Sequence, residues 1–76
     1  MRKYLQALRE ERQVSQTKLA HAAGVKPNYY CMIENGERQQ DMNLTIIEKL
    51  ATAFGVPMQT IIDAESAYRA QRPDTA

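Results

Sequence analysis

Two short helical patterns carry polar residues at their starts. The types and positions of these residues suit hydrogen bonding to an anion or to nucleobases. Gln16 directly follows Ser15, a good N-cap residue, so its amide lies where free backbone N–H groups and the helix dipole attract a phosphate. Lys26 and Asn28 open the second pattern, and an Asn amide can pair with adenine through two hydrogen bonds. From spacing alone, Gln16 could equally be a solvated residue at a helix start.

The second pattern has an outward face without an acidic residue before Glu34. Tyr30 and Ile33 are spaced to point inward, which leaves Tyr29 and Met32 outside. Tyr29 could bond a phosphate or stack, and Met32 could lie against a thymine methyl group. Arg38, in the segment that follows, is a candidate phosphate contact.

The sequence contains no constellation typical of catalysis or metal binding. His21 is the only histidine and has no cysteine or acid at a ligand spacing, so a surface histidine is expected. Cys31 is the only cysteine; it could be redox-active, but a small packing residue is the favoured interpretation. We therefore expect no enzyme, no metal, no cofactor and no small-molecule ligand.

Five helices are expected to position these side chains. Glycine at 24, 36 and 55 marks helix ends, Pro27 and Pro57 mark helix starts, and Asn43 is a further N-cap. Ala20 is small enough for two helices to cross closely. The expected helices cover residues 2–13, 15–23, 26–35, 44–54 and 57–62, and residues 64–69 can prolong the last of them.

Apolar spacing predicts the inward faces of these helices. The first helix presents Leu5 and Leu8 inward, with Arg9 partly buried, and the fifth presents Ile61 and Ile62. The remaining bases of the first helix, Arg2, Lys3 and Arg12, are expected on a solvated face. The clearest core stripe is that of the fourth helix: Leu44, Ile47, Leu50, Ala51 and Phe54.

Composition limits the class of protein. Seventy-six residues make one small domain, and the formal net charge is only +1. Residues 1–40 carry seven Lys or Arg against four acids, whereas residues 41–76 carry three against five, so the positive half also holds the two-helix pattern. The single cysteine and the absence of a signal peptide or a membrane-spanning run predict a cytoplasmic protein.

Four stretches occur in order along the chain: Leu8-Arg9, Ser15-Gln16-x-x-Leu19-Ala20-x-x-x-Gly24-Val25, Ile33-Glu34-Asn35-Gly36 and Leu50-Ala51-x-x-Phe54-Gly55-Val56. Together they resemble the lambda-repressor-like, Cro/C1-type (XRE) helix-turn-helix family. The resemblance runs from about residue 4 to residue 62 and implies an all-α, compact five-helix DNA-binding domain. We assign residues 1–64 to that domain and residues 65–76 to a helix extension with a polar tail.

The resemblance also implies residue roles. Gln16 matches a glutamine that clamps a backbone phosphate, and Arg9 and Glu34 match a buried salt bridge. The segment between residues 37 and 43 is longer than the common form and lacks its usual proline. Pro27 can meet a base only through van der Waals contact. The predicted DNA-binding residues are Gln16, Thr17, Lys26, Pro27, Asn28, Tyr29, Met32 and Arg38.

The sequence thus predicts a sequence-specific transcriptional regulator that binds double-stranded DNA. A repressor acting as a homodimer on a palindrome is the favoured form, with a dimer surface on the fifth helix at Met58, Ile61, Ile62 and Tyr68. A restriction–modification controller protein or an antitoxin would bind DNA in the same way. A helical protein–protein adaptor is the alternative of another class, and outward Tyr29, Cys31 and Met32 would suit it.

Overall fold

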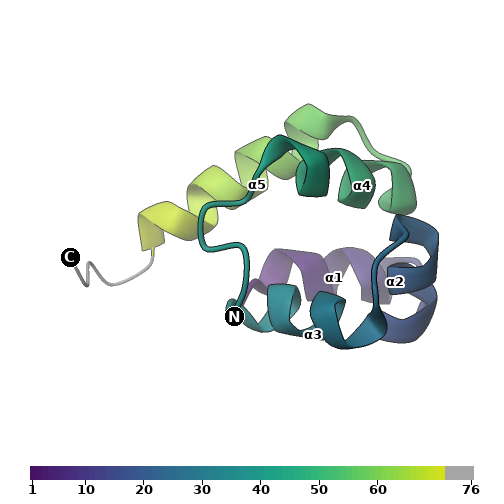
Figure 1. Ribbon diagram of the computed structural model, residues 1–76. Helices are drawn as coiled ribbons and strands as arrows, with labels where there is room; N and C mark the ends of the chain where they lie inside the picture. Colours follow the sequence, from purple (N-terminus) through teal and green to yellow (C-terminus); the bar gives the residue numbers. More distant parts are fainter. Residues whose placement is uncertain (72–76) are drawn as a thin grey trace.

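The computed structural model describes residues 1–71, and in this range the chain forms five helices and no strand (Figure 1). The all-α, five-helix fold class predicted from the sequence is confirmed. The polar tail over residues 72–76 lies outside the described residues. The helices are α1 (Lys3–Glu11), α2 (Gln16–Ala23), α3 (Pro27–Asn35), α4 (Leu44–Phe54) and α5 (Met58–Gln71).

The helix ends follow the capping residues. The Ser15 hydroxyl accepts a hydrogen bond from the Lys18 backbone N–H at 3.1 Å, and Asn43 Oδ1 accepts one from the Ile46 N–H at 2.9 Å. Pro27 is the first residue of α3. Helix α1 is shorter than the predicted 2–13, since it ends before Gln13, whose φ of 55° no helix can continue.

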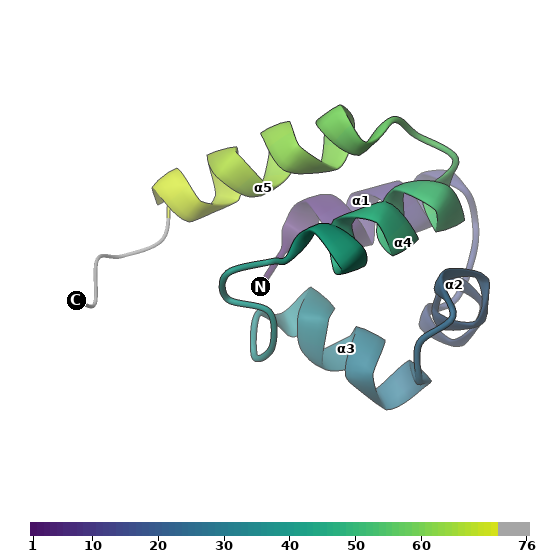
Figure 2. The same ribbon diagram turned by 45° about the horizontal axis from the view of Figure 1, so that its top comes forward.

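The core lies where α4 packs against α5 and α2, and where α2 crosses α3. Figure 2 shows α4 in the middle of the molecule, with α5 on one side of it and α3 on the other. Ala20 is fully buried, as the close crossing of two short helices requires. The buried apolar residues are Leu5, Leu19, Ala20, Ala23, Tyr30, Ile33, Ile46, Ile47, Leu50, Ala51, Phe54 and Ile61.

The prediction that Leu44 belongs to the core is wrong. Leu44 is 68% exposed, although the spacing of α4 placed it on the inward stripe. It is the first residue of the helix, and Ile46 is buried instead, so the covered face begins half a turn later.

The prediction of a solvated Arg2 is also wrong, because its side chain is fully buried. Arg2 Nε and Nη2 donate to the two carboxylate oxygens of Glu65 at 2.8 and 3.0 Å. The Tyr4 hydroxyl donates to the same carboxylate at 2.6 Å. Sequence periodicity missed this pair because its members are 63 positions apart. Helix α5 runs unbroken across residues 64 and 65, so Glu65 packs with the rest of the domain.

Arg12 is exposed, as predicted, but it also contacts the end of α4. Its Nε donates to the Phe54 carbonyl at 2.7 Å, and its guanidinium lies 5.8 Å from the centroid of the Phe54 ring. A cation at the C-terminal end of α4 satisfies a carbonyl that the helix itself leaves open. Arg12 therefore joins the end of α1 to the end of α4.

We expect Arg2→Met to lower the free energy of unfolding by about 3 kcal/mol or more, because it leaves the Glu65 carboxylate buried and unpaired. The measurement is the urea midpoint by circular dichroism. The control is Arg69→Ala, which removes an exposed contact to Asp41 and should cost less than about 1 kcal/mol. Equal midpoints for Arg2→Met and the wild type would contradict the buried pair.

Candidate nucleic-acid interface

Helices α2 and α3 are joined by a tight turn that leaves the start of α3 uncovered. Gly24 ends α2 with φ of 73°, and the Val25 N–H donates to the Ala20 carbonyl at 3.0 Å. Tyr30 and Ile33 anchor α3 from behind and are fully buried. Lys26, Pro27 and Asn28 are exposed at the N-terminal end of α3, as is Thr17 in the first turn of α2.

The Glu34 carboxylate connects three helices. Its side chain is 1% exposed, and Oε1 and Oε2 accept from Arg9 Nε and Nη2 at 2.8 and 3.1 Å. The Tyr30 hydroxyl and Gln16 Nε2 also donate to it, each at 2.9 Å. Arg9 comes from α1, Gln16 from α2, and Glu34 and Tyr30 from α3, so one buried group fixes their relative positions.

The pKa of Glu34 reflects these contacts. Burial by itself raises the pKa of a carboxyl group, but the donors Arg9, Tyr30 and Gln16 outweigh it and hold the Glu34 pKa below its ordinary 4.5. Burial and the bond to Glu34 raise the pKa of the Tyr30 hydroxyl. Glu34 is therefore ionised and Tyr30 neutral at pH 7.

Gln16 is half-buried at the start of α2, with its amide oriented by Glu34. An amide group carries two N–H donors, and Glu34 accepts from one of them. The second donor, with the backbone N–H groups of the first turn of α2, can serve an anion above the helix start. The sequence indicated this position but not the buried carboxylate that orients the side chain.

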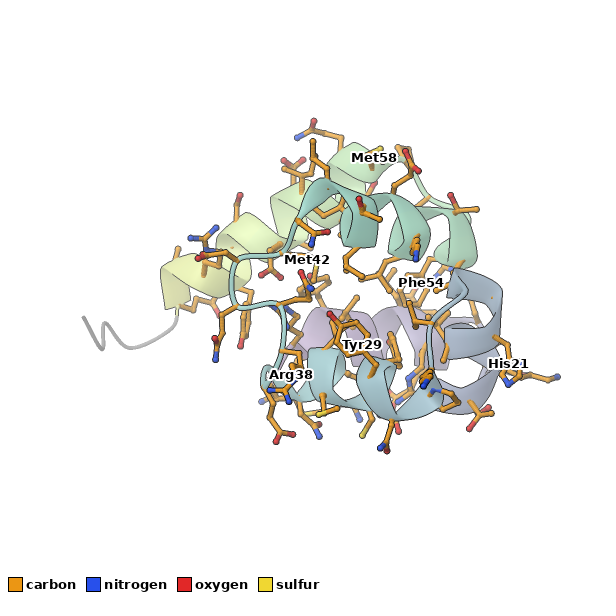
Figure 3. The ribbon with its side chains drawn as sticks, in the orientation of Figure 1. His21, Tyr29, Arg38, Met42, Phe54 and Met58 are labelled. Atoms are coloured by element: carbon orange, nitrogen blue, oxygen red, sulfur yellow. The ribbon has the colours of Figure 1, made fainter. Side chains whose placement is uncertain are left out.

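Tyr29 does not belong to the outward face that the sequence predicted. It is half-buried against the core, and its hydroxyl accepts a hydrogen bond from Gln39 Nε2 at 2.6 Å. Figure 3 shows Tyr29 on the side of α3 that faces α4. The segment between α3 and α4 supplies the Gln39 partner, and local spacing within α3 gave no sign of it.

Two further predicted residues lie beyond the start of α3. Met32 is half-buried one turn after Asn28. Arg38 is exposed just past the C-terminal end of α3, where Figure 3 shows it at the edge of the molecule. Its carbonyl accepts from Arg2 Nη1 at 3.1 Å. The structure thus leaves Thr17, Lys26, Pro27 and Asn28 exposed at the starts of α2 and α3. It places Gln16 against Glu34 in the last turn of α3, with Arg38 just past that end.

Only some of the basic residues in the first half of the chain present their charge to solvent. Arg2 and Arg9 are held in buried ion pairs, so they contribute little to the charge that an approaching ligand meets. Lys3, Lys18, Lys26 and Arg38 are exposed. Lys18 was not singled out from the sequence, although its place two residues after Gln16 puts it in the same helical turn.

The predicted dimer residues do not share one environment. Ile61 is fully buried in the core, so its assignment to a dimer surface is wrong. Met58, Ile62 and Tyr68 are half-buried on α5. The Tyr68 ring lies 5.2 Å from Arg2 Cζ and 6.5 Å from the Tyr4 ring, so it also packs within the chain.

His21 is exposed, and Figure 3 shows it at the outer edge of α2. Cys31 is half-buried and forms no disulfide, with Asn35 Nδ2 3.7 Å from its sulfur. Over residues 1–71, no group of three His, Cys, Asp or Glu side chains is arranged to hold a metal ion. Within the same residues, no helix has the length and apolar character needed to cross a membrane.

In a comparison with known families, residues 5–61 match the helix-turn-helix family. The matched range begins in α1 and ends in α5, so it includes both helices of the candidate interface. No curated protein matches the chain.

We expect acid to destabilise the wild type more steeply than Glu34→Gln. The folded-state pKa of Glu34 is below its ordinary 4.5, so the unfolded state binds more protons and stability falls as pH drops through and below that value. One such group contributes a slope of at most about 1.4 kcal/mol per pH unit. Urea unfolding at a series of pH values measures it. Parallel curves for the two proteins would contradict an ionised, hydrogen-bonded Glu34.

Proposed function

The chain belongs to the Cro/C1-type helix-turn-helix family and is a DNA-binding regulator, and we propose that it represses transcription by binding a palindromic operator as a homodimer. The observation that carries the proposal is the start of α3, where Lys26, Pro27 and Asn28 are exposed while Tyr30 and Ile33 hold the helix from behind. An exposed, rigidly supported helix start suits insertion into the major groove.

The proposed contacts divide into two kinds. Asn28 reads a base edge, and Lys26 reaches a guanine or a phosphate, with Pro27 and Met32 in van der Waals contact nearby. Gln16, Thr17 and Arg38 contact the backbone and fix the position of the domain on the duplex. Tyr29 has no place in this assignment because its hydroxyl is bonded to Gln39.

The homodimer is proposed from interface size. A single module buries only about 600–1,000 Å² on DNA, and a second half-site about 34–36 Å away supplies the missing affinity and specificity. On α5, Met58 and Ile62 are partly exposed apolar side chains available to such a contact. A domain bound over an operator would block access to the promoter, which is the basis for proposing repression.

A restriction–modification controller or an antitoxin would use the same surface, and genomic neighbours distinguish these roles. The adaptor alternative loses support from Tyr29, which is half-buried against the core with its hydroxyl bonded to Gln39.

The test is selection of genomic fragments by the purified protein, followed by footprinting. We expect Asn28→Ala to relax base preference at one position in each half-site and Gln16→Ala to weaken all sequences about equally, because one contact is to a base and the other to a phosphate. Binding should fall steeply between about 50 and 200 mM salt. The reverse pattern for the two variants, or binding that ignores salt, would overturn the proposal.

For the dimer we expect Ile62→Lys to raise the dissociation constant of the homodimer at least about tenfold, because it places a charge in an apolar contact. Thr60→Lys is the matched control, since it adds the same charge at an exposed position of α5. Sedimentation equilibrium measures both. A wild type that stays monomeric, or equal dissociation constants for the two variants, would rule out this surface.

A further inference from the structure

We propose that Arg2 and Glu65 form a positioning pair through which α5 holds the end of α3 and the Arg38 segment in the geometry that contacts DNA. This inference rests on the proposed function, because it concerns the Arg38 contact. We use "Arg2 network" for Arg2, Tyr4, Glu65 and the carbonyl groups that Arg2 binds.

Arg2 closes the C-terminal end of α3. Its backbone N–H donates to the Glu34 carbonyl at 2.7 Å, and Nη1 donates to the Ile33 carbonyl at 2.6 Å. The last carbonyls of a helix lack partners within the helix, and a positive charge there is favourable. The last turn of α3 has no basic residue of its own. Arg2 supplies both the donors and the charge from another part of the chain.

Arg2 also holds the segment after α3. Nη1 donates to the Arg38 carbonyl at 3.1 Å, and Nη2 donates to the Gln39 carbonyl. Gln39 has φ of 56°, a conformation that few residues adopt without external support. Its side chain donates to Tyr29 and accepts from the Asn43 N–H at 3.3 Å. The backbone beside Arg38 is thus fixed by Arg2 on one side and by the Gln39 amide on the other.

Helix α5 determines where the Arg2 guanidinium points. Glu65 accepts from Nε and Nη2, which fixes the plane of the guanidinium, and Tyr68 lies 5.2 Å from its Cζ. In this orientation Nη1 and Nη2 reach the carbonyls of Ile33, Arg38 and Gln39. Lysine lacks this planar set of five donors and could not make the same contacts.

The arrangement of the helices agrees with this coupling. Figures 1 and 2 both show the N-terminus beside the end of α3 and the segment that leads to α4. A second contact joins α5 to that segment, because Arg69 Nη2 lies 3.0 Å from Asp41 Oδ1. The latter pair is exposed and contributes little, so the buried pair carries the coupling.

The experiment is a double-mutant cycle between the Arg2 network and Arg38. The variants are Arg38→Ala, the paired replacement Arg2→Met with Glu65→Gln, and all three changes together. The paired replacement leaves no unpaired buried charge, and the amide oxygen introduced by Glu65→Gln would keep an acceptor for the Tyr4 hydroxyl. Circular dichroism checks that each variant is folded. The probe is a fluorescein-labelled random-sequence duplex of about 30 base pairs, read by fluorescence anisotropy.

In the wild-type background we expect Arg38→Ala to weaken binding about fivefold, the size of one exposed ion pair. It should also lower the salt slope, d log K/d log[salt], by about 0.9 in magnitude. In the background of the paired replacement, Arg38→Ala should weaken binding less than about twofold and leave the salt slope unchanged. A merely structural role for the pair would lower the fraction of active protein without changing the slope. Arg69→Ala is the control and should leave the effect of Arg38→Ala intact.

If Arg38→Ala weakens binding equally in the wild type and in the paired replacement, the positioning role is overturned and the proposed function stays in place. No effect of Arg38→Ala in the wild type also overturns it, because there is then no contact to position. A wild type that does not bind the duplex refutes the proposed function itself. Should the paired replacement not fold, Arg2→Lys replaces it, keeps the charge opposite Glu65, and must reduce the effect of Arg38→Ala in the same way.

Discussion

The buried carboxylate of Glu34 is the interaction on which the arrangement of the first three helices depends. It accepts hydrogen bonds from Arg9 on α1, Gln16 on α2 and Tyr30 on α3. A buried charge is costly unless its partners are all in place, so the three helices have one favourable relative position. This position orients the Gln16 amide, and it also sets the direction in which the start of α3 is presented.

A second buried ion pair acts at the other end of α3. Arg2 and Glu65 are both almost fully buried, and Arg2 binds carbonyls that α3 and the following segment leave open. A chain of this size has a small core, and apolar contacts between short helices tolerate sliding and rotation. Hydrogen-bonded charges do not tolerate such movement, because their bonds depend on distance and angle. Over residues 1–71, no buried side-chain nitrogen or oxygen lacks a hydrogen-bond partner, as a domain with such pairs requires.

The proposed DNA-binding surface is the part of α3 that these supports leave uncovered. Helix α3 is fixed by Tyr30 and Ile33 along its inner side, by Glu34 toward α1 and α2, and by Arg2 at its end. Its first turn, with Lys26, Pro27 and Asn28, is exposed. Polar contacts made by a rigid element lose little conformational freedom on binding, which favours affinity and discrimination between sequences. The chain uses its buried charges for position and its exposed polar groups for the proposed contacts.

The sequence by itself determined the five helices, most of their ends and the family, because those depend on local signals. Ser15 and Asn43 cap, Gly24 and Pro27 define the turn, and helical spacing marks most of the core. Tertiary structure alone decided the contacts of Arg2, Arg12 and Tyr29 and the exposure of Leu44. The partners of Arg2 and Arg12 are far away in the sequence, and the Tyr29 hydroxyl accepts its hydrogen bond from Gln39 in a segment without periodicity. Helical spacing gives the direction in which a side chain points from its own helix. Whether that side chain is buried depends on which other elements pack against that face.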